Sequence, residues 1–136
     1  MNFYKSSKSK IHGSSYREVL KEAEAIFKQI KSRTKRTPYA RSKYFRSEKI
    51  FLNILWSHLH EKHERERVRR LKFYACAIDL IKSSSYDPIT RENFKQRDEV
   101  LHRFSGKSKE GEIFTVQIKE NKRTKRKDLI SIFPDN

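Results

Sequence analysis

The sequence predicts an α+β protein in which N-terminal helices pack on a C-terminal antiparallel β-sheet of three to four strands. Apolar residues recur at helical spacing over much of residues 15–82, whereas from residue 98 onward they form short β-branched and aromatic runs. The two patterns meet at Ser83–Pro88, where three serines and a proline disfavour a continuing helix. Helices first and a meander of strands last is the order typical of this fold class.

The first predicted helix spans about residues 15 to 32. Ser15 and Glu18 form a capping-box pattern, in which the hydroxyl and the carboxylate bind each other's free backbone amides. A second helix is expected from near Ser47, and a third carries Val68 to Ile81. No Gly or Pro forces a break between these two, so two helices and one kinked helix both remain open.

Residues 1–14 are rich in Ser and Lys and are expected to form a mobile basic arm. The remainder, 15–136, is expected to be a single domain, with its helical part at 15–82 and its sheet at 98–134. The predicted strands are 100–104, 113–118 and 129–133, with a short fourth strand around 89–91.

Strand alternation predicts which side chains face the helices. Phe114, Val116 and Ile118 are expected to face the helices, so that Gln117 and Lys119 lie on the opposite face. In the last strand Ile130 and Ile132 are expected to point inward, which places Ser131 on the same face as Gln117.

The chain has 136 residues, with 33 Lys and Arg against 17 Asp and Glu, and a formal net charge of +16. Such a charge attracts polyanions, so RNA or an acidic protein is the expected partner. The strongest basic block lies between residues 28 and 49 and is interleaved with tyrosines, which can stack on bases while the cations meet phosphates. The alternative is that this block is a solvent-exposed connecting segment whose tyrosines pack against the rest of the domain. The predicted nucleic-acid contacts are Arg33, Lys35, Arg36, Tyr39, Arg41, Lys43, Lys122, Arg123, Lys125, Arg126 and Lys127.

Several other functions are not supported by the sequence. The single cysteine, Cys76, cannot form an intrachain disulfide and is expected to be a small core residue. His60 and His63 are three residues apart, which is the wrong spacing for a zincin helix, and no metal or cofactor is expected. No apolar run is long enough to cross a membrane, and the N-terminus lacks the apolar segment of a signal peptide, so a cytoplasmic location is expected.

The predicted sheet carries a candidate catalytic set, His102, Arg103, Gln117, Lys119 and Ser131, in which His102 lies either beside the other four residues or buried. A histidine can act as acid or base, and cations and hydrogen-bond donors can stabilise charge at phosphorus, which together suffice for RNA cleavage without a metal. The alternative is that these residues form an ordinary solvent-exposed sheet face without a catalytic role.

Three segments of the sheet region carry a resemblance: LHRFSG at 101–106, GEIFTVQIKE at 111–120 and KDLISIFP at 127–134. In this order they resemble the C-terminal half of phage-barnase toxins, within the larger group of barnase-, colicin- and RelE-like ribonucleases. The resemblance covers about residues 65–134. It implies helices before an antiparallel sheet whose open face cuts RNA, the five candidate residues as the site, and an acidic antitoxin as a partner. A glutamate base such as barnase uses is not evident in the sequence.

A second ribonuclease pattern competes with the first. Arg97 and His102 have the spacing of the arginine and histidine of HEPN ribonucleases, but HEPN domains are helical bundles and this segment leads into a strand. We therefore expect a metal-independent endoribonuclease toxin of mobile-element type that acts through the RNA 2′-hydroxyl. The alternative is a nucleic-acid-binding protein without catalysis, such as a regulator or a ribosome-associated protein.

Overall fold

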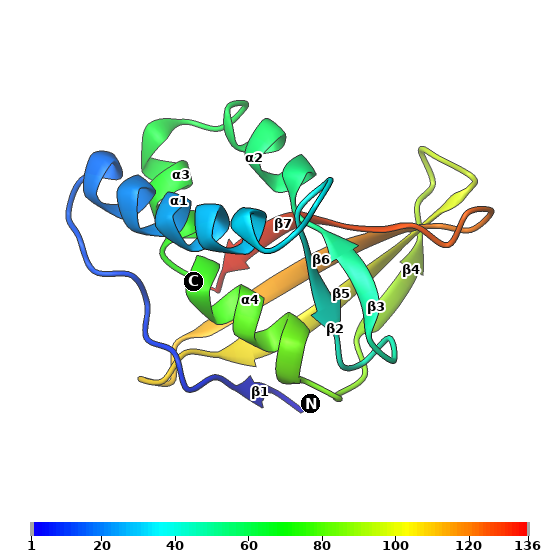
Figure 1. Ribbon diagram of the computed structural model, residues 1–136. Coiled ribbons are helices and arrows are strands. Elements are labelled where there is room, and N and C mark those ends of the chain that lie inside the picture. Colours follow the sequence, from blue (N-terminus) through cyan, green and yellow to red (C-terminus); the bar gives the residue numbers. More distant parts are fainter. Residues whose placement is uncertain (1, 136) are drawn as a thin grey trace.

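A computed structural model describes residues 2–135 (Figure 1). These residues form four helices and seven strands, with helices placed between strands. In chain order they are β1 (Tyr4–Lys5), α1 (Tyr16–Ser32), β2 (Tyr39–Ser42), β3 (Glu48–Phe51), α2 (Asn53–Leu59), α3 (Glu64–Leu71), α4 (Tyr74–Ser83), β4 (Ile89–Glu92), β5 (Glu99–Lys107), β6 (Ile113–Asn121) and β7 (Lys127–Pro134).

All seven strands belong to one mixed sheet with the order β1-β5-β6-β7-β3-β2, and β4 pairs with β5. The centre, β5-β6-β7, is an antiparallel meander, whereas β3 runs parallel to β7 and β1 runs parallel to β5. The predicted fold class is therefore wrong: the sheet is larger and mixed, and helices are interspersed with strands.

The prediction failed at β2 and β3 because both strands are only four residues long and are interrupted by charged residues, Arg41 in β2 and Glu48 and Lys49 in β3. Their segment reads as a basic connection, and Ile50 and Phe51 read as the first turn of a helix. In the structure Ile50 is buried and lies beside Lys127 of β7. This pairing is between segments distant in sequence, and no local pattern shows it.

Most predictions for individual helices and strands are confirmed. Helix α1 begins after Ser15, whose Oγ accepts a hydrogen bond from the Glu18 amide over 3.3 Å, so the predicted cap is confirmed. The three predicted strands lie within β5, β6 and β7, and the short fourth strand is β4. The open question about the later helices is resolved as three separate helices, α2, α3 and α4.

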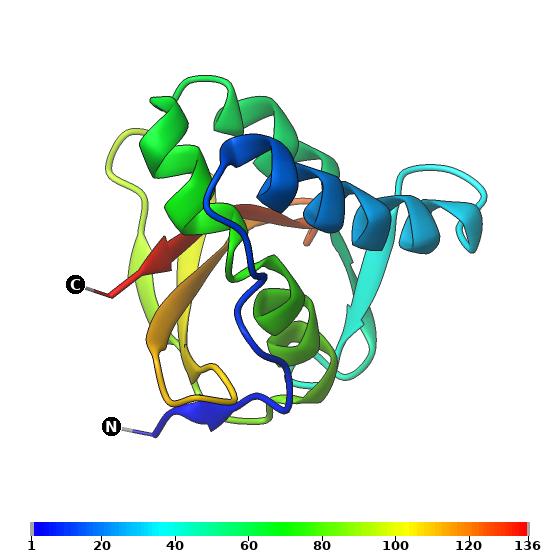
Figure 2. The same ribbon diagram turned by 90° about the vertical axis from the view of Figure 1, so that its left-hand side faces the viewer.

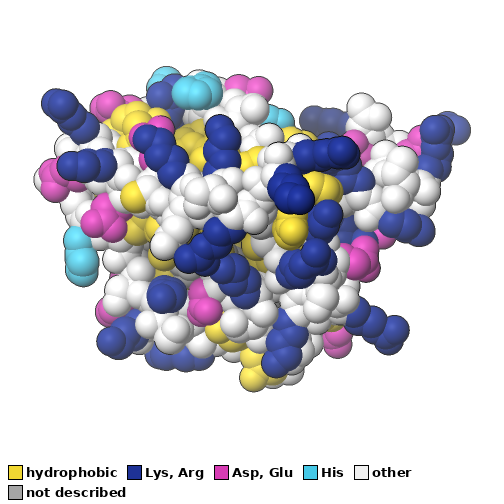
Figure 3. Space-filling view, in the orientation of Figure 1, with side chains coloured by type: hydrophobic (Ala, Val, Ile, Leu, Met, Phe, Trp, Pro, Cys, Tyr) yellow, Lys and Arg dark blue, Asp and Glu magenta, His cyan; other side chains and the backbone are white. Residues whose placement is uncertain are grey.

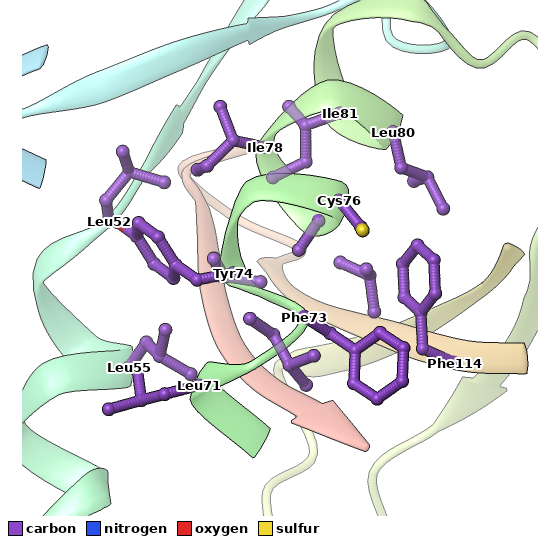
Figure 4. Packing of buried hydrophobic residues seen from close by; sticks show 14 of the residues in the cluster. Leu52, Leu55, Leu71, Phe73, Tyr74, Cys76, Ile78, Leu80, Ile81 and Phe114 are labelled. Carbon is purple, nitrogen blue, oxygen red and sulfur yellow. The ribbon is translucent and has the colours of Figure 1, made fainter. Parts of the chain in front are cut away.

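The sheet curls around α4, which lies in its hollow side (Figure 2). Phe73, just before α4, stacks on Phe114 of β6 with ring centroids 5.3 Å apart, and Cys76 is buried beside them (Figure 4). Burial raises the pKa of the Cys76 thiol to about 11, as expected for an inert core cysteine. We call the face of the sheet that packs on α4 the inner face and the opposite one the outer face.

The N-terminal segment differs from the expected free arm. Strand β1 pairs with the end of β5, and Tyr4 Oη and Ser6 Oγ both donate hydrogen bonds to Asp79 of α4, over 2.8 and 2.7 Å. Ile11 is buried in the core. The segment contains only a few apolar residues among its lysines and serines, which is why its packing was not predicted.

Within residues 2–135, no helix has the length and apolar character required to cross a bilayer.

Candidate functional site

Three of the predicted catalytic residues form a row across the outer face. Arg103 of β5, Gln117 of β6 and Ser131 of β7 are direct cross-strand partners. Arg103 Nε donates a hydrogen bond to Gln117 Oε1 over 2.7 Å, which fixes the guanidinium against the sheet. The row arises because these positions share one face of three adjacent strands.

A β-bulge sets the position of Ser131. The register shifts between Gln117 and Ile118, so that these residues pair with Ser131 and Leu129, and Ile130 is the extra residue. Leu129 and Ile132 are therefore both buried, whereas Ile130, which was expected to point inward, is only partly buried. Without the bulge, Ser131 and Leu129 would lie on the same face.

Arg70, on helix α3, extends the row beyond Ser131. Its Nη1 donates a hydrogen bond to Ser131 Oγ over 3.2 Å. The guanidinium carbons of Arg70 and Arg103 lie 4.9 and 5.6 Å from the centroid of the Phe133 ring, so one aromatic ring lies against two cations. We call Arg70, Arg103, Gln117 and Ser131 the arginine row.

Glu66 holds Arg70 in place. Its carboxylate pairs with Arg70 Nε at 3.2 Å and with Arg69 Nη1 at 2.9 Å. Burial by itself would raise the pKa of Glu66, but the hydrogen bond from Arg70 and the charges of both arginines outweigh it, and the pKa is lowered. Sequence reasoning missed Arg70, because it belongs to a helix whose packing against the end of β7 depends on the tertiary structure.

Lys119 lies on the same face of β6 as Gln117, two residues further along the strand. Its Nζ is 3.6 Å from Glu99 Oε2, and Asn93 Nδ2 donates to Glu99 Oε1 over 3.0 Å. The Glu99 carboxylate and the Lys119 ammonium thus form a loose pair on the same face as the arginine row. Glu99 supplies the carboxylate that was not evident in the sequence; strand alternation from Arg103 is the signal that could have found it.

His102 does not join the other four candidates. It points to the inner face, is 7% exposed, and both ring nitrogens are bonded, Nδ1 to Thr90 Oγ1 at 2.8 Å and Nε2 to Glu120 Oε1 at 2.7 Å. Glu120 lies 3.6 Å from Lys127 Nζ, which also pairs with Glu48 at 2.8 Å. We call these residues the inner cluster.

The basic block at residues 28–49 and Arg126, in the turn between β6 and β7, meet in a cavity of about 720 Å³, which we call the basic groove. They meet because β3 pairs with β7, beside the loop that carries Arg126. The groove is lined by Arg33, Thr34, Lys35, Arg36, Thr37, Tyr39, Lys49, Phe51 and Arg126. Figure 3, in the orientation of Figure 1, shows Lys and Arg side chains gathered over the end of α1 and over β2 and β3.

Aromatic rings lie among the cations of the groove. The Arg126 guanidinium lies 4.1 Å from the Phe51 ring centroid, and Lys49 Nζ lies 4.8 Å from that of Tyr39. Tyr39 and Phe51 themselves meet edge to face at 6.3 Å. Cations beside aromatic rings are the combination that holds single-stranded nucleic acid.

The other predicted nucleic-acid contacts have different positions. Arg41 and Lys43 line a neighbouring cavity of about 510 Å³, and Arg123 and Lys125 are exposed in the turn between β6 and β7. Lys122 pairs with Glu92. Lys127 is 4% exposed and held by two carboxylates in the inner cluster, which leaves its ammonium unavailable to a phosphate.

Across residues 2–135, no three His, Cys, Asp or Glu side chains are grouped so that they could hold a metal ion. The alternative based on Arg97 and His102 requires a helical bundle, and His102 instead lies within strand β5.

Comparison with known proteins returned no match: no family model and no curated protein matches the sequence, and no solved structure matches the fold. The resemblance to phage-barnase toxins therefore remains a prediction.

Proposed function

We propose that this protein is an endoribonuclease that cleaves RNA by attack of the 2′-hydroxyl, without a metal ion. The 2′-oxygen forms a bond to phosphorus while the bond from phosphorus to the 5′-oxygen breaks. The 2′-hydroxyl proton passes to a base, and an acid supplies a proton to the leaving 5′-oxygen. The products are a 2′,3′-cyclic phosphate and a 5′-hydroxyl end.

The observation that carries the proposal is the arginine row. Arg70 and Arg103 place two planar guanidiniums near one ring, Phe133, with Gln117 and Ser131 between them. Guanidiniums match phosphate geometry, and prearranged cations stabilise the charge that develops on phosphorane oxygens. In this arrangement the row binds the scissile phosphate.

The Glu99 and Lys119 pair supplies the proton transfers. The 3.6 Å separation of Lys119 Nζ and Glu99 Oε2 is longer than a hydrogen bond, so both atoms can turn to substrate while Glu99 Oε1 stays bonded to Asn93. The Glu99 carboxylate accepts the 2′-proton, and the Lys119 ammonium donates one to the leaving oxygen. The role expected for His102 is not part of the proposal, since its ring is buried on the other face and bonded at both nitrogens.

The basic groove supports RNA as the substrate class, because its cations and rings suit a single strand. A toxin role, a neutralising acidic antitoxin and a cytoplasmic location are part of the same proposal. Their support is the net charge of +16 and the resemblance of the sheet segments.

The test is incubation of the purified protein with total RNA in excess EDTA. We expect cleavage that leaves cyclic phosphate ends, and a loss on the order of 100-fold or more when Arg70→Ala and Arg103→Ala are combined. The control is Arg17→Ala with Lys21→Ala, which also removes two positive charges but from exposed positions of α1. Thermal melting checks that each variant folds. Equal cleavage by both double variants would show that the site is not at the arginine row.

A second function, nucleic-acid binding without catalysis, is favoured by the basic groove alone. It predicts salt-sensitive RNA binding by the wild type and no cleavage products at any protein concentration. That result would leave the arginine row as a binding surface and would end the ribonuclease proposal.

A further inference from the structure

One aromatic side chain has no role in the core. Phe94, in the turn between β4 and β5, is 99% exposed. A fully exposed phenylalanine gains nothing from burial on folding, which leaves its ring accessible to a binding partner.

The turn that carries Phe94 is braced rather than loose. Asn93 N donates to Glu99 O over 3.1 Å, and Asn93 Oδ1 accepts from the Lys95 amide over 3.2 Å. Lys122 of the neighbouring β6–β7 turn pairs with Glu92, and its amide donates to Asp98 O over 2.7 Å. These bonds join the two turns and hold the Phe94 backbone at a defined place beside the outer face.

Phe94 shares a cavity with the arginine row. A cavity of about 250 Å³ is lined by Phe94, Leu101 and Arg103, with Arg91 and Lys95 among its other lining residues. Its one lining carboxylate, Glu92, is the partner of Lys122. The cavity therefore combines an exposed ring, an aliphatic side chain and cations, one of which belongs to the proposed phosphate site.

We propose that Phe94 is the stacking platform for an unpaired nucleobase next to the scissile phosphate. The inference rests on the proposed function and deepens it, because it names the substrate class as unpaired RNA. A base can stack on the ring and contact Leu101 while Arg103 holds the adjoining phosphate. A paired base has both faces covered by its neighbours in the helix and cannot occupy the cavity.

The subsite accepts any of the four bases. Every base has a π face, so stacking does not discriminate among them. The Asn93 side chain, adjacent to Phe94 in the sequence, bonds to Glu99 and to the Lys95 amide, so its hydrogen bonds serve the turn rather than a base edge.

The test measures binding separately from cleavage. The probe is a short single-stranded 2′-O-methyl RNA that contains 2-aminopurine and cannot be cleaved through a 2′-hydroxyl. We expect stacking to quench its fluorescence with the wild type and with Phe94→Tyr. Phe94→Ala should abolish the quenching and weaken binding roughly 5- to 150-fold. Tyr86→Ala, at another exposed aromatic position, is the matched control and should bind like the wild type.

Cleavage then provides the second readout. Unmodified single-stranded RNA should be cut faster than a duplex of the same sequence, and Phe94→Ala should lose this preference with an unchanged melting temperature. If the wild type cleaves RNA, and Phe94→Ala still quenches the probe and prefers single-stranded RNA as the wild type does, the inference is overturned and the proposed function stays intact. Quenching that depends on Phe94, with no cleavage by the wild type, would overturn the ribonuclease proposal and keep the base subsite.

Discussion

His102 Nε2 and Glu120 Oε1 lie 2.7 Å apart on the inner face of the sheet, while Arg103, the next residue along β5, faces the opposite side. The two neighbours thus belong to different clusters. His102 joins a network of polar and charged side chains that connects β4, β5, β6 and β7 to Glu48 of β3, and Arg103 joins the arginine row on the outer face.

The inner cluster predicts a specific dependence of stability on pH. Burial by itself would raise the pKa of Glu120, but the hydrogen bond with His102 and the charges of Lys127, His102 and Lys125 outweigh it, and the pKa falls below the ordinary 4.5. A carboxylate with a lowered pKa stabilises the fold fully above that ordinary value, and this contribution is lost as the pH falls through the folded-state pKa.

Glu120→Gln should therefore lower the free energy of unfolding by about 1–3 kcal/mol at pH 7, with the gap from the wild type closing below about pH 4.5. Chemical denaturation between pH 3 and 7 measures both curves. Glu24→Gln, at an exposed position of α1, serves as the control and should follow the wild type. A gap that stays constant down to pH 3 would contradict the role given to Glu120.

The basic groove predicts how RNA binding changes with salt. Lys35→Ala combined with Arg36→Ala should reduce the slope of log affinity against log salt by about 1.4, since each lost contact with a single-strand phosphate removes about 0.7. Titrations of an unstructured RNA at several salt concentrations measure the slope. The pair Arg17→Ala and Lys21→Ala, on the exposed surface of α1, should change it less. Equal slopes for the two pairs would show that net charge, not the groove, binds RNA.

Gly106 is predicted to be a position where an added Cβ forces neighbouring side chains to shift. A Cβ at this position would lie 2.7 Å from Phe114 Cζ and 2.8 Å from Leu80 Cδ1, where β5 meets α4. Gly106→Ala should therefore lower the free energy of unfolding by about 1–3 kcal/mol through overpacking. Adding Leu80→Ala should make the combined loss smaller than the sum of the two single losses. Additive losses in urea denaturation would disprove the contact.

Asp79 is predicted to hold the N-terminal segment on the domain. It accepts hydrogen bonds from Tyr4 and Ser6, so Asp79→Ala should cost about 1–3 kcal/mol. Hydrogen exchange should accelerate at the Ser6 amide, which donates to Lys107 O over 2.8 Å. Asp98→Ala, at an exposed position, is the comparison variant. If the Ser6 amide stays protected without Asp79, strand pairing alone retains the segment.

Elements with a local signal were predictable from the sequence. The cap at Ser15 depends on Glu18 three residues away, and the runs in β5, β6 and β7 repeat with the period of a strand. The parts that were missed depend on distant partners. Lys127 bonds to Glu48, 79 residues away in the sequence, and the parallel pairing of β3 with β7 that brings them together has no turn or local period to reveal it.

The candidate site divides in the same way. Strand alternation alone determines that His102 and Arg103 lie on opposite faces and that Gln117 and Lys119 share one face, because successive side chains of a strand point to opposite sides. Only the tertiary structure decided which face is open. On the inner face the Phe45 ring, from the turn between β2 and β3, lies 5.1 Å from the His102 ring and 6.0 Å from the Phe104 ring. The bulge at Ile130 turns Ser131 outward, and α3 brings Arg70 to it. These outcomes depend on packing between elements far apart in sequence, and such packing is decided by the whole fold rather than by any single segment.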